Sequence, residues 1–311
     1  MRREALFWLL PMAAFFAFPD HLALGAQVLI MALFAVSLDL VLGYAGIVSL
    51  GHAAFFGFGA YTAGLLAVRA GWTEPISALL VAVLAAAVLG FATSFLVVRG
   101  QDLTRLMVTL GIGLLLYEAA NRAAFLTGGV DGLSLPEGAV LGFRFDLRGR
   151  TAYVYSLVVL FLIFLGARRL VASPFGLSLR GIREGRSRMP ALGAPVRWRL
   201  VAVYTIAAGM AGAAGALLVQ TTQFVGIDTL AFHRSADLLM ILVLGGAGRL
   251  YGGIVGAAIF MVAQDKLADI NPVYWQFWIG LLLVLVVLFA RGGLLGALDA
   301  IRTRFARTQP A

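Results

Sequence analysis

The chain has 311 residues, of which 61% are hydrophobic and 13% are charged, and its mean hydropathy is +0.96. Soluble globular domains are about half apolar and about a quarter charged, so this composition excludes a single water-soluble domain and favours a protein that spans a lipid bilayer. The absence of cysteine excludes disulfides and thiolate metal sites, and the three histidines stand too far apart in sequence to predict a histidine metal cluster.

The net charge of +9 does not indicate a nucleic-acid partner. The arginines lie between apolar stretches rather than on a basic soluble domain, and the preference of positive residues for the cytoplasmic side of a membrane explains them better. The sequence also contains no nucleotide-binding loop, catalytic triad or metal motif. We therefore expect neither an enzyme nor a bound cofactor.

Ten apolar segments predict an all-α fold, a polytopic bundle of about ten transmembrane segments in one domain over residues 1–311. They cover residues 5–19, 22–44, 47–68, 75–98, 103–126, 152–167, 200–223, 235–245, 252–263 and 273–290. A straight spanning helix needs about 17 to 25 apolar residues. The eighth and ninth segments are shorter, so they are either halves of a broken span or re-entrant arms, and they meet at a glycine-rich stretch. The first segment resembles a secretory signal, but the many spans after it favour a retained helix.

Arginine counts orient these segments. Residues 168–199 contain eight arginines and one acidic residue, and four arginines lie in the C-terminal tail. Such loops face the cytoplasm, which places the loop near 171–199 and both termini inside. The loop near 128–150, which mixes acids with arginines, then lies outside.

The first glycine-rich stretch, residues 43–61, is the main candidate for the translocation path. Glycines weaken a helix by about 1 kcal/mol each and favour an unwound turn, where backbone groups can face a polar solute. The candidate residues are Gly43, Gly46, Ser49, Gly51, His52, Gly57 and Tyr61. The alternative is close helix packing through small residues, and for His52 alone a hydrogen-bonded structural role is favoured.

A second glycine-rich stretch lies near the C-terminal end and adds Gly245, Gly246 and Gly248 to the candidate path. Residues 42–46 and 244–248 match in their Leu-Gly and Ala-Gly positions, and Gly51 and Gly253 continue the match at the same offset. This match indicates either a duplicated glycine turn, as in transporters built from repeats, or chance in a glycine-rich chain.

The cytoplasmic loop contains a short amphipathic helix between turn signals at Ser173-Pro174 and Pro190. Leu179 and Ile182 share one face, with Arg180, Arg183 and Glu184 beside them. Such a helix either lies on lipid headgroups or docks in the groove of a partner protein. Among ionisable residues inside the predicted spans, Glu118 and Arg122 can pair on one helix, whereas Asp39 has no local partner and should face a neighbouring helix or a cavity.

Three motifs resemble those of permease subunits of branched-chain amino-acid ABC importers of the LivM type. They are Gly46-Ile-Val-Ser-Leu-Gly-His-Ala-Ala-Phe-Phe-Gly57, the loop Ser173-Pro-Phe-Gly176 with Arg180-Gly-Ile-Arg183-Glu184 and Ala191-Leu192-Gly193, and Val243-Leu-Gly-Gly-Ala-Gly248 with Gly252-Gly-Ile-Val-Gly256. They occur in the family's order and cover nearly the whole chain. One departure is that Gly185, Arg186, Arg188, Met189 and Pro190 follow the Arg-Glu pair where the family usually has Asn-Glu and small residues.

The resemblance implies a permease subunit in the bacterial inner membrane. Its partners would be a second homologous permease, two cytoplasmic ATP-binding subunits, a periplasmic substrate-binding protein and membrane lipid. The cytoplasmic loop, with Arg180, Arg183, Glu184, Leu192 and Gly193, would dock in an ATP-binding subunit and couple ATP hydrolysis to transport. The solute would be a branched-chain amino acid, with urea, short amides or another small solute as alternatives. A stand-alone secondary transporter or channel is the alternative from another class, for which Asp39 is the only candidate ion site.

Overall fold

The structure, a computed structural model, describes residues 2–100, 102–136, 138–140, 143–145, 149–289 and 292–296. Helices dominate them, as predicted. The long ones are α1 (Arg2–Ala17), α2 (Leu22–Asp39), α3 (Ala53–Arg69), α4 (Pro75–Arg99), α5 (Asp102–Arg122), α7 (Arg150–Ala172), α8 (Pro174–Glu184), α9 (Val196–Thr222), α10 (Phe232–Gly245), α11 (Leu250–Ile270) and α12 (Trp275–Phe289). Short elements are α6 (Ala124–Thr127), a π-helical turn η2 (Leu40–Tyr44) and the 3₁₀ turns η1 (Pro19–His21), η3 (Gly129–Asp131), η4 (Met189–Leu192) and η5 (Ile227–Leu230).

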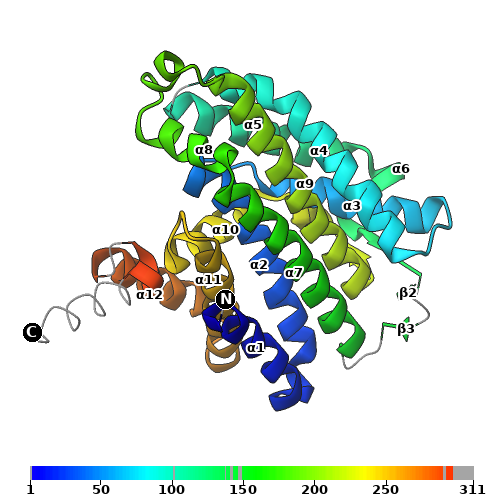
Figure 1. Ribbon diagram of the computed structural model, residues 1–311. Helices are drawn as coiled ribbons and strands as arrows, with labels where there is room; N and C mark the ends of the chain where they lie inside the picture. Colours follow the sequence, from blue (N-terminus) through cyan, green and yellow to red (C-terminus); the bar gives the residue numbers. More distant parts are fainter. Residues whose placement is uncertain are drawn as a thin grey trace, which may run out of the picture.

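Helix α9 runs through the centre of the bundle and is packed by α2, α3 and α4 (Figure 1). Its middle is built from alanine and glycine, which lets neighbouring backbones approach closely. A Cβ atom on Gly59 of α3 would overlap the backbone of Gly212 in α9, and a Cβ atom on Gly212 would overlap Ala86 in α4. Small residues therefore fix α3, α4 and α9 at contact distance.

Five helical segments of the described part are long and apolar enough to cross a membrane. They are Pro19–Tyr44, Pro75–Arg99, Leu103–Arg122, Arg150–Ala172 and Val196–Thr222. The pair α10 and α11, bent by 112° at a short break, makes a sixth, and three further apolar helices are shorter. The all-α polytopic bundle is thus confirmed. Each predicted apolar segment overlaps one of these helices, but the count of about ten crossings stays a prediction.

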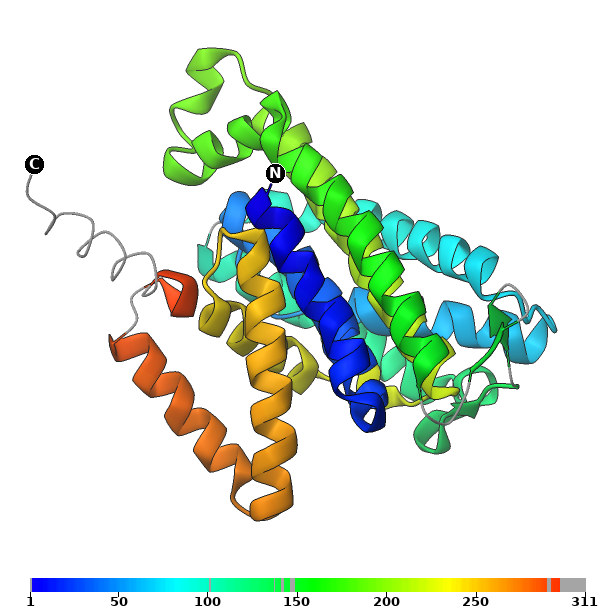
Figure 2. The ribbon, with the colours of Figure 1, turned by 60° about the horizontal axis from the view of Figure 1, so that its bottom comes forward.

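The two long loops lie at opposite ends of the bundle, because α7 connects them. At one end, here called the loop end, β1 (Leu133–Ser134) pairs with β4 (Phe224–Val225), and β2 (Ala139–Val140) pairs with β3 (Phe143–Arg144). Helix α8 lies at the other, the α8 end (Figure 2). Helix α2 begins beside Gly149 at the loop end and ends beside α8. The structure therefore separates the arginine-rich loop from the mixed loop as predicted.

Candidate translocation path and coupling site

The first candidate glycines form a break between α2 and α3, here called the first break (residues 40–52). After Asp39 the helix widens into the π turn η2, and the chain then leaves helical geometry at Gly46, whose φ of +70° favours glycine. The nitrogen of Ile47 donates to the carbonyl of Val41 at 2.9 Å, which closes this turn. The chain continues without regular structure until α3 begins at Ala53. The predicted unwound turn is therefore present.

The late glycines form the second break (residues 246–249), the turn between α10 and α11. Gly246 and Gly248 have φ values of +105° and +84°, which L-residues with side chains rarely adopt. A Cβ atom on Gly245 would overlap the carbonyl of Gly252 across the bend. Both glycine-rich stretches found in the sequence therefore interrupt helices.

The two breaks are in contact with each other. The Oδ1 atom of Asp39 accepts a hydrogen bond of 2.6 Å from the nitrogen of Gly248. A Cβ atom on Gly43 would overlap both the Asp39 carboxylate and the Gly248 nitrogen, so only glycine fits there. The matching stretches 42–46 and 244–248 thus meet in space, and Asp39, which has no local partner in the sequence, bridges them.

Helix α8 is the amphipathic helix predicted for the cytoplasmic loop. The Ser173 hydroxyl caps it by accepting from the nitrogen of Gly176, and Pro174 occupies the first turn. Leu179 and Ile182 are buried on one face. Helix α8 packs against α7, α9 and η2, so its apolar face lies on the bundle.

Two arginines of α8 contact the first break. Arg183 donates through Nη1 to the carbonyl of Gly43, and a Cβ atom on Gly46 or Gly248 would lie 3.0 Å from the Arg183 side chain. The guanidinium of Arg180 lies over the ring of Tyr44, 5.2 Å from its centroid. The Arg183 side chain of α8 therefore lies beside both breaks.

The other coupling candidates point away from these contacts. Glu184 is exposed at the end of α8, and Leu192 is 78% exposed. Gly193 has a φ of +75° and open space around it. Trp198 and Leu177 are each 61% exposed, which gives the α8 end of the chain an apolar surface. Such a surface is suited to a partner protein.

Ser49 and His52 are fully buried just before α3. The Ser37 hydroxyl donates to the carbonyl of Phe34 at 2.6 Å and lies 2.9 Å from Nε2 of His52. Because a hydroxyl carries one proton, Nε2 of His52 is the donor in the second bond and His52 is the Nε2–H tautomer. The imidazole also stacks on the Phe34 ring. His52 is therefore buried and hydrogen-bonded within the bundle, and its role stays a prediction.

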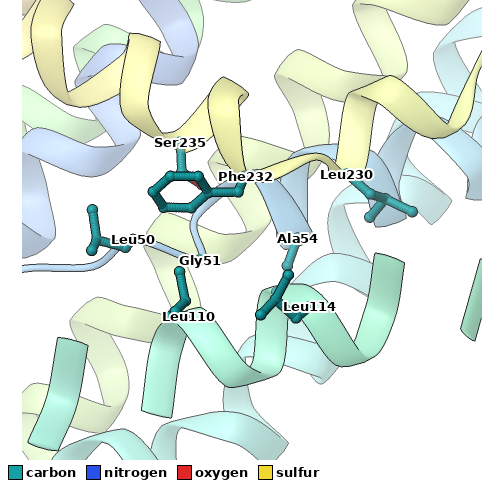
Figure 3. Close-up of a pocket in the computed structure, with 9 residues that line it drawn as sticks. Leu50, Gly51, Ala54, Leu110, Leu114, Leu230, Phe232 and Ser235 are labelled. Atoms are coloured by element: carbon teal, nitrogen blue, oxygen red, sulfur yellow. The ribbon is translucent and has the colours of Figure 1, made fainter. Parts of the chain in front are cut away.

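Gly51 lies against α5 beside a small cavity (Figure 3). A Cβ atom on Gly51 would overlap the carbonyl of Thr109, whose hydroxyl accepts from the nitrogen of Leu50 at 3.2 Å. The nitrogen of Ala53, at the start of α3, donates to the Ser235 hydroxyl of α10 at 2.9 Å. The beginning of α3 is thus held by α5 and α10 together.

Gly57 and Tyr61 lie further along α3, toward the loop end. A Cβ atom on Gly57 would overlap the Leu230 side chain. Tyr61 is 5% exposed in a small apolar cluster with Val219, Val225 and Leu230. In this conformation the path glycines contact protein atoms rather than open space.

Sequence reasoning missed several residues here. Thr109 and Ser235, which hold the first break, carried no recognisable signal. A charged stretch over η5 and the beginning of α10 did carry one, namely Asp228, His233, Arg234 and Asp237 within ten residues at the beginning of an apolar segment. Among the described residues there is no group of three or more His, Cys, Asp or Glu that could hold a metal ion.

Comparison with known proteins identifies the family. The profile of the family described as branched-chain amino acid transport system / permease component matches residues 22–287. The chain is 31% identical to the high-affinity branched-chain amino acid transport system permease protein LivM of Salmonella typhimurium over 88% of this chain and 69% of the relative, and 29% identical to LivM of Escherichia coli over 86% and 68%. It is also 29% identical to the autoinducer 2 import system permease protein LsrC of an Enterobacter strain over 79% and 72%. No solved structure is significantly similar. The chain therefore belongs to the family of branched-chain amino acid transport system permease components.

Proposed function

We propose that this chain is the permease subunit of an ATP-driven importer of branched-chain amino acids. Family membership and the names of the LivM relatives support the solute class. The observation that carries the coupling role is the contact of Arg183 in α8 with the carbonyl of Gly43 in the first break. This contact connects α8, where an ATP-binding subunit would bind, to the first break between α2 and α3.

Ten segments cross the membrane in this proposal, with α8 and both termini on the cytoplasmic side of the bacterial inner membrane. Helix α10 together with the chain that precedes it from β4 forms one crossing, and helix α11 forms the next, so that the two meet at the second break. The arginine excess around α8 supports this orientation. The apolar surface of α4, where Leu84 and Val88 are 65% and 67% exposed, suits contact with lipid.

The partners would be a second homologous permease, two cytoplasmic ATP-binding subunits and a periplasmic substrate-binding protein. Leu177, Leu192 and Trp198 would form part of the surface for the ATP-binding subunit, with Glu184 and Gly193. Helix α5 buries little of its apolar surface within the chain, which fits a further subunit beside it. The glycines from Gly43 to Gly57 and from Gly245 to Gly248 would permit the conformational change of transport.

A different small solute is a second candidate, because the LsrC relative is named for autoinducer 2 import.

Copurification of the tagged chain from its native membrane identifies the partners by mass spectrometry. A calorimetric screen of the copurified binding protein against branched-chain amino acids, urea, short amides and autoinducer 2 identifies the solute. Copurification of two ATP-binding subunits and binding of leucine, isoleucine or valine support the proposal. If the chain purifies without partners and transports solute by itself, it is instead a secondary transporter or channel.

A further inference from the structure

Helix α10 begins with a cluster of ionisable side chains, His233, Arg234 and Asp237, which together with Asp228 of η5 has no role in the proposed function. Asp228 of η5 accepts from Arg234 at 2.9 Å and lies 3.0 Å from Nε2 of His233. Asp237 follows Arg234 by three residues, so both lie on one side of α10. The side chains of Asp228 and His233 are 55% and 56% exposed, and that of Arg234 is 36% exposed.

Packing partners place this cluster between the two ends of the bundle rather than at either end. Leu230 contacts Gly57 of α3, and Ser235 accepts from the nitrogen of Ala53, the first residue of α3. Helix α3 has 17 residues and rises about 25 Å to the loop end. Gly59 touches Gly212 near the middle of α9, a confirmed long apolar helix. Residues 228–237 therefore lie at the height of the hydrocarbon core.

Exposed charges at this height cannot face lipid, because hydrocarbon does not solvate them. Helix α4 shows what a lipid-facing surface of this chain looks like. Its Ala86 packs on Gly212, at the middle of α9, and the neighbouring exposed residues are Leu84 and Val88. The charged face of α10 thus differs in kind from the face of α4. Charged residues in a span face either the interior of a bundle or a water-filled cavity, and the exposed side chains of this face fit a cavity.

The chemistry around the cluster is that of an α-amino acid. The guanidinium of Arg234 retains donors beyond its bond to Asp228, and its Nε has no partner among the described residues. Asp237, a turn away, offers a carboxylate of opposite sign. Beside them Leu50, Leu110, Leu114 and Phe232 line the small cavity next to Gly51 (Figure 3). A zwitterionic head and an apolar side chain would find complementary groups side by side.

We propose that the face formed by Asp228, His233, Arg234 and Asp237 lines the path and transiently binds the zwitterionic head of a hydrophobic amino acid. Arg234 holds the α-carboxylate, Asp237 holds the α-ammonium group, and Phe232 and Leu114 contact the side chain. The identity of the solute in this proposal rests on the proposed function. The water-lined position of the face rests instead on the position of residues 228–237 along the bundle and on the charges of their side chains.

Thiol labelling of the complete transporter tests the position, since the chain has no native cysteine. His233→Cys is the reporter, Phe232→Cys is a second reporter that leaves the ion pairs intact, and Val88→Cys is the control at similar height on α4. A membrane-impermeant methanethiosulfonate added to both sides of proteoliposomes should modify both reporters and not the control. Reporters that stay unmodified would show that a partner subunit covers the face, and would overturn the proposal.

Protection and transport test the solute. Leucine should slow modification of Phe232→Cys, and Arg234→Gln should abolish this protection and lower leucine uptake at least about tenfold, as expected for loss of a charge-assisted bond. Arg122→Gln, which breaks an exposed pair on α5, is the matched control with normal uptake. Modification without protection, or normal uptake by Arg234→Gln, would overturn the binding role. A wild-type transporter that does not import leucine would refute the proposed function, while reporter labelling would still decide whether the face is water-lined.

Discussion

The carboxylate of Asp39 lies 2.6 Å from the backbone nitrogen of Gly248, a residue 209 positions later in the chain. Asp39 is fully buried, and Arg183 of α8 donates to the carbonyl of Gly43 one turn further along. Three parts of the chain are therefore joined at one point, namely the end of α2, the turn between α10 and α11, and helix α8. This arrangement gives the proposed coupling a short physical route.

Replacing Asp39 with alanine should weaken the contact between the two breaks. The nitrogen of Gly248 would lose its acceptor in a buried site, which costs about 1–3 kcal/mol. Asp39→Asn keeps an acceptor oxygen of the same size and should be milder. Thermal unfolding of the detergent-purified chain, followed by tryptophan fluorescence, measures the difference. Equal midpoints for both variants would show that this bond does not stabilise the fold.

Arg183→Gln should separate ATP hydrolysis from uptake in the proposed transporter. The variant removes the charged donor to Gly43 but leaves the exposed surface of α8 for a partner, so hydrolysis should persist while uptake falls about tenfold or more. Both rates are measured on the same proteoliposomes, and Arg122→Gln at the far end of α5 serves as the control. Parallel loss of hydrolysis and uptake would indicate that Arg183 acts in assembly rather than in coupling.

Gly51→Ala should displace α5 from the beginning of α3. The new Cβ atom would overlap the carbonyl of Thr109, which is backbone and cannot rotate away. Gly111→Ala on α5 itself has open space and favours the helix, so it should be neutral or stabilising. The rate of trypsin digestion of the two purified variants, Gly51→Ala and Gly111→Ala, measures the difference. Similar resistance in both would mean that the packing at Gly51 adapts without loss.

The orientation of the chain predicts opposite labelling of two single cysteines. Ser187 and Ser134 are exposed in the two long loops, at the α8 end and the loop end respectively. In intact cells with a permeable outer membrane, an impermeant maleimide should modify Ser134→Cys and should modify Ser187→Cys only after the inner membrane is opened. Modification of Ser187→Cys in intact cells would reverse the topology.

Much of this fold could be predicted from local patterns in the sequence. Apolar length located the spans, and the signals at Ser173 and Pro174 located the beginning of α8, because capping and propensity act over a few residues. The glycines at 46, 246 and 248 marked backbone that only glycine readily adopts. Their roles in transport remain predictions.

The contacts between distant parts of the chain could not be predicted in the same way. The partner of Asp39 is a backbone nitrogen, which every residue except proline has, so nothing in the sequence marks Gly248 as the donor. The same holds for Ser235, which caps α3 from another helix. The position of Asp228 and Arg234 along the bundle also depends on packing. In the sequence they fall between the predicted apolar segments 200–223 and 235–245.

The central claim is tested most directly by leucine uptake into proteoliposomes that contain this chain together with its copurified partners and binding protein. With ATP enclosed on the side of α8, labelled leucine should accumulate above its external concentration, and a non-hydrolysable ATP analogue should abolish accumulation. Accumulation that needs no ATP but follows an ion gradient would contradict the account, as would ATP hydrolysis that leucine-loaded binding protein stimulates without any uptake of leucine.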